Sequence, residues 1–242
     1  MRKTRIFYPG SININDTLTL PANASHHLIR VLRYKKDTAI TVFNGQGGEY
    51  SAILLNENPK ATQLSLRRYT DIHRESQLTT ILLQGVSRGD HMDTTIQKAT
   101  ELGASEIVPI ICERSVNINK TRINKKLDRW HQILISACEQ CGRNLLPRLH
   151  EISTLEAVLE SASGATRLML DPAAAGGVNS IAPHQDTVCI LCGPEGGLTE
   201  REIDAAEKAG YIGIAFGPRV LRTETAGPAF ISALQTLWGD MG

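Results

Sequence analysis

From residue 79 to residue 238, short apolar runs of strand length alternate with longer runs whose apolar residues recur at helical spacing. The strand-length runs are residues 79–85, 106–111, 167–170, 187–192 and 212–216. The helical runs are residues 90–102, 124–141, 155–161, 199–209 and 226–238. Thr199 and Glu202 have the spacing of a capping box at the start of one helix. This alternation predicts an α/β fold, with a mostly parallel sheet and helices on both of its faces.

The N-terminal part follows a different pattern. Residues 39–43, 49–55 and 62–68 are short runs with partial alternation, and Asn44-Gly45 and Gly47-Gly48 mark a turn between the first two. Residues 26–31 are expected to form one short helix, and the polar stretch 70–77 reads as a linker. The sequence therefore predicts a small all-β barrel or sandwich ahead of the α/β domain.

Charge is unevenly distributed over the 242 residues, whose net charge is +1. Residues 1–75 contain 11 Lys and Arg against 6 Asp and Glu, a net of +5, and the remainder contains 15 against 19, a net of −4. A basic module beside a mildly acidic one indicates contact with a polyanion, although an ordinary solvated surface explains the same numbers. No apolar stretch approaches the roughly 20 residues that span a membrane, and no signal-type segment follows the basic start. We therefore expect a cytoplasmic protein with reduced thiols.

The cysteine spacing suggests a metal site only superficially. Cys138 and Cys141 can share a helix face, but Cys189 and Cys192 lie on an expected strand, where residues three apart point to opposite faces. We therefore expect buried thiols and no metal. Neither the dinucleotide-binding glycine pattern nor a P-loop is present, so the glycine-rich loops of this chain serve another ligand.

Two such loops stand out near the C-terminus. L-C-G-P-E-G-G-L occupies residues 191–198, and F-G-P-R-V-L-R-T-E-T-A occupies residues 216–226. Each follows an expected strand and opens with Gly-Pro where that strand should end. Because open α/β sheets bind ligands at the carboxyl ends of their strands, the two loops predict a ligand site at one edge of the sheet.

Several charged or polar groups remain open to two interpretations. Arg219, Arg222 and Glu224 in the second loop form either a structural salt-bridge cluster or a set that contacts substrate, which we favour for loops at this edge. The basic stretch 117–126, with Lys120, Arg122, Lys125 and Lys126, is either a solvated loop and helix start or a phosphate-contacting loop.

Both loops closely resemble those of the RsmE-type family, SPOUT-superfamily methyltransferases that modify the N3 position of a uridine in small-subunit ribosomal RNA. The segments S-R-G-D-H-M-D at 87–93, Q-K-A-T-E-L-G at 97–103, A-C-E-Q-C-G-R at 137–143 and H-H-L-I-R-V-L-R at 26–33 are also similar to that family. The resemblance covers essentially the whole chain.

The resemblance implies a PUA-like RNA-binding β-barrel over residues 1–72 and a SPOUT methyltransferase domain with a trefoil knot over residues 73–242. It further implies S-adenosylmethionine as cofactor, a homodimer through the C-terminal domain, and 16S rRNA or the assembled small ribosomal subunit as partner. A methyltransferase of the same fold acting on tRNA, and a non-catalytic RNA-binding or assembly protein, are the alternatives. The intact glycine loops argue against the second.

Residue roles follow from the loops, the charge distribution and the resemblance together. Arg222 is expected to stabilise charge on a uracil carbonyl, and Glu224 to act as a base or to hold Arg222. Expected cofactor-binding residues are Leu170, Pro172, Leu191, Gly193, Gly197, Phe216, Gly217, Leu221, Arg222 and Thr223. Expected RNA-binding residues are Arg2, Lys3, Arg5, Arg30, Arg33 and Arg88.

Overall fold

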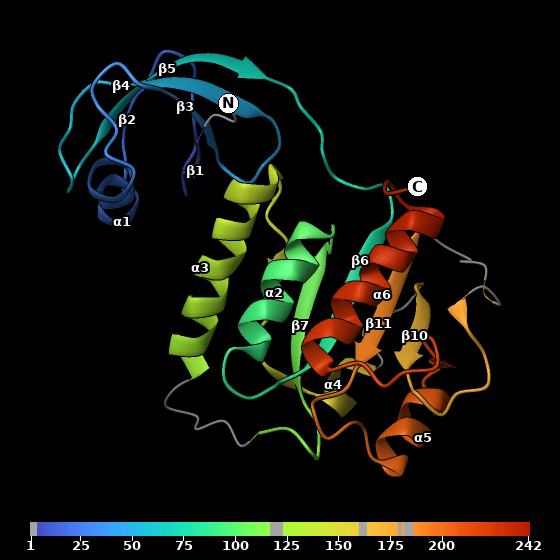
Figure 1. The fold of residues 1–242 in the computed structure, drawn as a ribbon. Helices are drawn as coiled ribbons and strands as arrows, with labels where there is room; N and C mark the ends of the chain where they lie inside the picture. Colours follow the sequence, from blue (N-terminus) through green and yellow to red (C-terminus); the bar gives the residue numbers. More distant parts are fainter. Residues whose placement is uncertain (1–3, 117–122, 160–163, 179–180, 182–185) are drawn as a thin grey trace. The chain divides into compact units, whose positions relative to one another are not determined.

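The chain forms two compact units in the computed structural model, which describes residues 4–116, 123–159, 164–178, 181 and 186–242 (Figure 1). The first unit is Met1–Glu75 with Cys138–Leu146, and the second is Ser76–Ala137 with Pro147–Gly242. The sequence did not predict that Cys138–Leu146 joins the first unit. None of the helices in the described ranges is long and apolar enough to cross a membrane.

The first unit is built on a five-stranded sheet with the order β1-β3-β4-β5-β2. Strand β1 pairs parallel with β3, and the other pairs are antiparallel. The strands are β1 Arg5–Phe7, β2 Thr17–Thr19, β3 Ala39–Phe43, β4 Glu49–Leu54 and β5 Gln63–Thr70. The three longer strands confirm the all-β prediction, whereas β1 and β2 are too short to give a periodic signal.

A short helical segment between β2 and β3 differs from the predicted one. The helix α1 (Ala22–His26) begins earlier than expected and continues into a π-helical turn, η1 (His27–Val31). Leu28 is fully buried in the core of the unit, while Val31 at the end of η1 is 58% exposed. The segment therefore packs through one side and presents its end to solvent.

The second unit contains a parallel sheet with the order β12-β10-β11-β6-β7-β8, in which the short β9 also pairs with β7. Its strands are β6 Thr79–Gly85, β7 Glu106–Ile111, β8 Arg148–Leu149, β9 Ser153–Thr154, β10 Thr166–Leu170, β11 Thr187–Cys192 and β12 Ile212–Ile214. The predicted parallel sheet is confirmed. The trefoil knot stays a prediction, because strand order alone does not establish how the chain threads.

Helices cover both faces of this sheet, as the alternation predicts. On one face α2 (His91–Glu101) packs against α6 (Thr223–Trp238), which contacts β6 and β11, and α3 (Ile123–Cys141) lies beside α2 (Figure 1). On the other face α4 (Leu155–Leu159) and α5 (Glu200–Lys208) bury a core that includes Leu83, Met169 and Leu191.

Two boundaries near the glycine loops matter for function. The capping box of α5 forms as predicted, with Thr199 accepting from the Glu202 backbone N–H. Helix α6, however, begins at Thr223 rather than at residue 226. Glu224 therefore lies in the first turn of a helix and not in a loop, and its carboxylate is near the positive end of the helix dipole. The second glycine loop ends at Arg222, the N-cap of α6.

Candidate functional site

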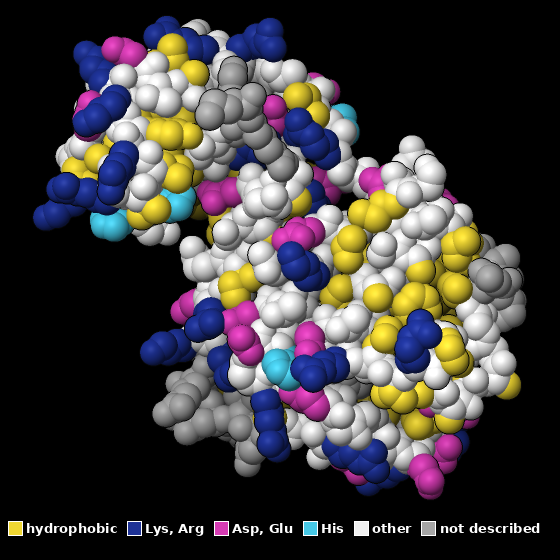
Figure 2. Space-filling model, viewed as in Figure 1, with side chains coloured by type: hydrophobic (Ala, Val, Ile, Leu, Met, Phe, Trp, Pro, Cys, Tyr) yellow, Lys and Arg dark blue, Asp and Glu magenta, His cyan; other side chains and the backbone are white. Residues whose placement is uncertain are grey.

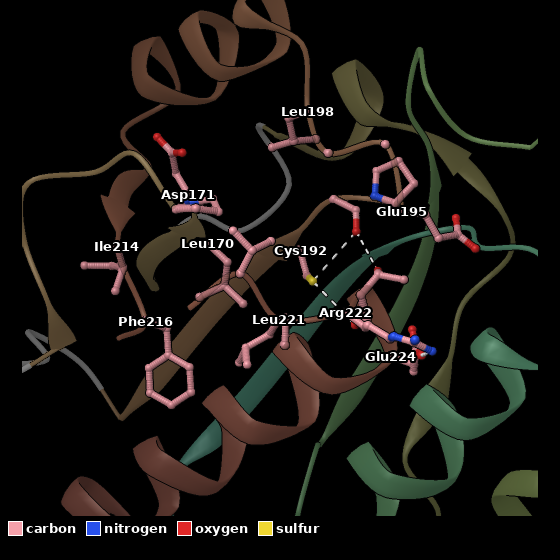
Figure 3. A pocket seen from close by; sticks show the side chains of 18 of the residues that line it. Leu170, Asp171, Cys192, Glu195, Leu198, Ile214, Phe216, Leu221, Arg222 and Glu224 are labelled. Atoms are coloured by element: carbon pink, nitrogen blue, oxygen red, sulfur yellow. Dashed lines mark hydrogen bonds and ion pairs between the residues drawn. The ribbon is translucent and has the colours of Figure 1, made fainter. Parts of the chain in front are cut away.

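A pocket of about 620 Å³ lies at the carboxyl edge of the parallel sheet, where β10, β11 and β12 end. Residues 192–198 after β11 and 219–224 after β12 form most of its lining, and residues 170–172 at the end of β10 lie between them. Figure 3 shows Leu170, Ile214, Phe216 and Leu221 on one side of the pocket and Glu195, Arg222 and Glu224 on the other. The volume and the mixed lining are those of a small-molecule site.

Side-chain hydrogen bonds join the two glycine loops. The Thr223 hydroxyl donates to the Gly193 carbonyl at 2.8 Å and accepts from the Gln84 side-chain amide at 2.9 Å. The Cys192 thiol contacts the carbonyl oxygens of Gly193 and Thr223 (Figure 3). The pairing of the two loops at one sheet edge, predicted from their common position after strands, is confirmed by these contacts.

Close backbone approach explains why glycine stands at two of the positions around the pocket. A Cβ at Gly85, the last residue of β6, would lie 2.3 Å from the Pro194 nitrogen and 2.7 Å from the Gly193 carbonyl carbon. A Cβ at Gly193 would lie 3.2 Å from the Gly197 carbonyl carbon and from the Leu198 nitrogen. Side chains here would push the first glycine loop out of its conformation.

The pocket gathers the predicted cofactor residues with one exception. Leu170, Pro172, Gly193, Gly197, Phe216, Gly217, Leu221, Arg222 and Thr223 all line it. Leu191 does not: its side chain is fully buried in the core beneath α4 and α5, because alternate residues of β11 point to opposite faces of the sheet. Cys192, the next residue, faces the pocket in its place.

The sequence analysis missed three titratable residues of the pocket. Asp171 follows β10 directly, Glu195 lies inside the first glycine loop, and His91 is the first residue of α2. The signal for Asp171 and Glu195 was present, since both follow predicted strands. His91 is about a hundred residues away in sequence, and the only signal for it was the segment 87–93 that is similar to the family, which gave His91 no role.

Arg222 and Glu224 differ sharply in their exposure. The Glu224 side chain is 16% exposed and the Arg222 side chain 83%, and the distance between Nη1 of the arginine and Oε1 of the glutamate is 4.0 Å. The other carboxylate oxygen of Glu224, Oε2, lies 3.2 Å from Nδ1 of His91. Arg222 is thus only loosely paired and solvent-exposed, whereas Glu224 is mostly buried beside His91.

The residues predicted to bind RNA fall into separate groups. Arg30, Arg33 and Arg88 are exposed, while Arg2 and Lys3 lie outside the described residues. Arg5 is 8% exposed, forms an ion pair with Glu49 and donates to the Asn144 side chain at 2.6 Å. Because its guanidinium is occupied inside the first unit, Arg5 is not available to phosphates and that expectation is revised. Lys120 and Arg122 also lie outside the described ranges, whereas Lys125 and Lys126 fall on α3.

The cysteine pairs do not converge. Cys189 contacts the Tyr211 hydroxyl at 3.3 Å on the α5 side of the sheet, and Cys192 faces the pocket. Burial raises the pKa of both thiols to about 11. On α3, a hydrogen bond from Cys138, together with the backbone N–H and the charge of Arg143, lowers the pKa of the Cys141 thiol. No group of three or more metal-binding side chains occurs in the part of the chain that the structure describes.

Comparison with known proteins gives consistent matches along the chain. A family model described as an RNA methyltransferase domain matches residues 74–235, and one described as an RNA methyltransferase PUA domain matches residues 20–66. The ribosomal RNA small subunit methyltransferase E of Buchnera aphidicola (subspecies Schizaphis graminum) is 34% identical over 99% of this chain and 98% of its own length.

Two solved structures match over nearly the whole length of both chains. The ribosomal RNA small subunit methyltransferase E of Neisseria gonorrhoeae, bound to S-adenosylmethionine, has a TM-score of 0.95 at 37% identity and covers 100% of both chains. A methyltransferase of Legionella pneumophila, also with bound S-adenosylmethionine, has a TM-score of 0.96 at 36% identity, covering 99% of this chain and 100% of its own.

A parallel sheet with a glycine-lined pocket at its carboxyl edge, preceded by a PUA-like sheet, defines this protein as an RNA methyltransferase by class. Within that class, the chain belongs to the family of the ribosomal RNA small subunit methyltransferases E. The predicted family and the two-part fold class are thereby confirmed.

Proposed function

We propose that the protein transfers a methyl group from S-adenosylmethionine to N3 of a uridine in the 16S rRNA of the small ribosomal subunit. The observation that carries this proposal is the pocket formed by the two hydrogen-bonded glycine loops. Two relatives with the same fold and similar length carry S-adenosylmethionine in their structures. When bound, that cofactor supplies the methyl group as an electrophile, and the protein supplies orientation and electrostatics.

The residues present fit this cofactor. Gly193 and Gly197 line the pocket, and a Cβ at Gly197 would meet no atom within 4 Å, so the backbone there is open to a ligand. Apolar side chains, including Leu170 and Phe216, offer a surface for an adenine ring, and the Phe216 ring is held edge-on against Phe230 at a centroid distance of 5.3 Å. The pocket also contains the carboxylates of residues 171, 195 and 224, which complement the positive charge of a sulfonium and an amino group.

The chain's own part in the reaction concerns the uracil ring. N3 carries a proton between two carbonyl groups, so the charge left by its removal spreads onto oxygen. Arg222 is solvent-exposed at the rim of the pocket and can place its guanidinium at such an oxygen, which stabilises the transition state more than the neutral ring. Glu224, held by neighbouring groups, is placed to take the proton or to orient Arg222.

The RNA and a second copy of the chain are the proposed macromolecular partners. We place the exposed Arg30 and Arg33 of the first unit and Arg88 of the second on the RNA-facing surface, with the work done in the cytoplasm on 16S rRNA or the assembled small subunit. Hydrophobic side chains gather on the face of the second unit that carries α6 (Figure 2). Leu237 on α6, Met241 just after it and Val220 in the loop before it are exposed. We propose this face as the homodimer contact; sedimentation showing only a 26.5 kDa species at micromolar concentration would contradict it.

Two measurements test the proposed function. Nucleotide mapping of rRNA from a deletion strain should reveal one uridine in 16S rRNA that lacks its N3 methyl group and regains it on complementation. Titration calorimetry should detect S-adenosylmethionine binding, which Gly193→Val should abolish because its side chain crowds residues 197 and 198. A modified tRNA in place of rRNA, or undiminished cofactor affinity in folded Gly193→Val, would contradict the respective part of the proposal.

A further inference from the structure

His91 lies where two carboxylates converge at the rim of the pocket. Its Nδ1 atom is 3.2 Å from Oε2 of Glu224 and 3.6 Å from Oε1 of Glu195. The three residues come from separate elements: the start of α2, the first turn of α6 and the loop after β11. No part of the chemistry described above uses the imidazole.

The facing atoms of this cluster lie close together without a hydrogen bond. Nδ1 of His91 and Oε2 of Glu224 are 3.2 Å apart, both are shielded from solvent, and neither has a hydrogen-bond partner within the described ranges. A carboxylate oxygen only accepts, and a ring nitrogen without its proton also only accepts. Two buried acceptors 3.2 Å apart are strongly unfavourable, and a protonated Nδ1 turned toward Oε2 would resolve the conflict.

The surrounding charges define how that proton is held. Glu195 accepts the backbone N–H of Arg88 at 2.7 Å, which holds its carboxylate near the same Nδ1 atom. Arg222 lies 4.0 Å from Oε1 of Glu224 but is largely solvated. Of the nearby acidic residues of α2, Asp93 is bound by Arg129, and Asp90 occupies the exposed N-cap.

We propose that His91 is a positioning residue for Glu224. A proton on Nδ1 holds Oε2 of Glu224 and relieves the repulsion between the carboxylates of Glu195 and Glu224, which leaves Oε1 of Glu224 as the oxygen that faces Arg222 and the substrate. This inference rests on the proposed methyl transfer, because it concerns the residue that positions Glu224 for that reaction.

A ring that can carry a proton, rather than a side chain of similar volume, is what this role requires. In His91→Gln no group between the two carboxylates can take up a proton, so their repulsion is no longer relieved. We expect single-turnover methylation to fall roughly ten- to a hundredfold at neutral pH. We also expect the acid limb of the pH–rate profile to move to higher pH. His91→Lys places a cation at this position and should return the acid limb of the profile toward its original pH. The double variant His91→Gln/Glu195→Gln, which removes one of the two carboxylates, should have the same effect.

Cofactor affinity and a matched control variant distinguish a positioning role of His91 from a structural role in forming the pocket. S-adenosylmethionine affinity should change by less than about threefold in His91→Gln, since the residue acts on the catalytic carboxylate. His131→Gln, an exposed histidine on α3, should leave rate and profile unchanged. An unaltered pH profile in His91→Gln, equal losses in the Gln and Lys variants, or a parallel collapse of cofactor binding would each overturn the proposal.

A measurement without cofactor or RNA keeps the inference separate from the proposed function. In the nitrogen-15 NMR spectrum of the free protein, the His91 signal, assigned by its absence in His91→Gln, should show a protonated Nδ1 at neutral pH. A bare Nδ1 with the proton on Nε2 would overturn the inference. Absence of methylation in the wild-type protein would instead refute the proposed function and leave the NMR result intact.

Discussion

Two ionisable residues of the pocket, Arg222 and Glu224, differ in how far their side chains are exposed to solvent. The Arg222 side chain is 83% exposed and loosely paired, while Glu224 is mostly buried against His91. A solvated arginine contributes little to folding stability, so its removal tests catalysis rather than structure.

Arg222→Ala should lower the rate of methyl transfer about 10²–10³-fold, the typical cost of removing one electrostatic donor from a transition state. Its melting temperature should match that of the wild type, and cofactor affinity should fall far less than turnover. Single-turnover methylation and calorimetry measure the two effects. Arg201→Ala, which removes an 87% exposed arginine of α5 that does not line the pocket, is the matched control. A rate within about threefold of wild type would show that Arg222 has no catalytic role.

The cysteines provide a second test on single residues. The Cys138 thiol and Arg143 lower the pKa of Cys141, whereas burial raises the pKa of Cys112 to about 12. Since the thiolate is the reactive form, iodoacetamide should modify Cys141 first, and still at pH values where ordinary thiols are protonated. Cys138→Ala removes the hydrogen-bond donor and should slow this reaction at neutral pH. Mass spectrometry identifies the modified thiol, and preferential labelling of Cys112, Cys189 or Cys192 would contradict the assignment.

Among the helices, strands and loops, the pocket depends on contacts that join three segments. Gln84 lies on β6 next to Gly85, Gly193 opens the first glycine loop, and Thr223 begins α6. The Thr223 hydroxyl lies between the other two groups, so one side chain fixes the distance between loops that are thirty residues apart in sequence.

Thr223→Val keeps the shape of the side chain but removes this link. We expect a loss of about 1–3 kcal/mol in the free energy of unfolding, because buried polar partners lose a hydrogen bond. S-adenosylmethionine affinity should fall as well, since the two glycine loops are no longer held together. Urea unfolding and calorimetry measure the two effects. Thr225→Val, on the exposed side of the same turn, should change neither quantity; equal behaviour of the two variants would contradict this role of Thr223.

Over the whole molecule, the charge distribution assigns RNA binding chiefly to the first unit. The net charge is +5 over residues 1–75, and Arg30 and Arg33 flank the exposed side chains of Val31 and Leu32. These arginines are free of the internal ion pairs that bind Arg5 among the described residues. Arginines that bind phosphates release counterions and make the affinity depend on salt.

Replacing both Arg30 and Arg33 by Ala should weaken rRNA binding and lower the slope of log affinity against log salt by about 0.7 for each phosphate that is no longer neutralised. Filter binding at several salt concentrations measures the slope. Arg201→Ala removes an 87% exposed arginine from α5 and should leave the slope unchanged. An unchanged slope in the double variant would exclude these arginines as phosphate ligands.

Local sequence was sufficient to specify most of the elements and their order. Strands β3, β6, β7 and β11 and the capping box of α5 follow from local apolar runs and turn or cap residues, which depend only on neighbours in the chain. The two glycine loops identified the ligand edge for the same reason: each follows a strand, and parallel strands end at one edge.

The identity of the side chains that meet at this edge required the packed structure. The Leu191 side chain lies in the core and Cys192 lines the pocket, because the sheet has two faces and the face that a strand residue occupies depends on what packs against it. Arg5 is occupied by Glu49 and by Asn144, which is distant in sequence. His91 reaches Glu224 because α2 and α6 pack side by side, a long-range arrangement that no local pattern encodes.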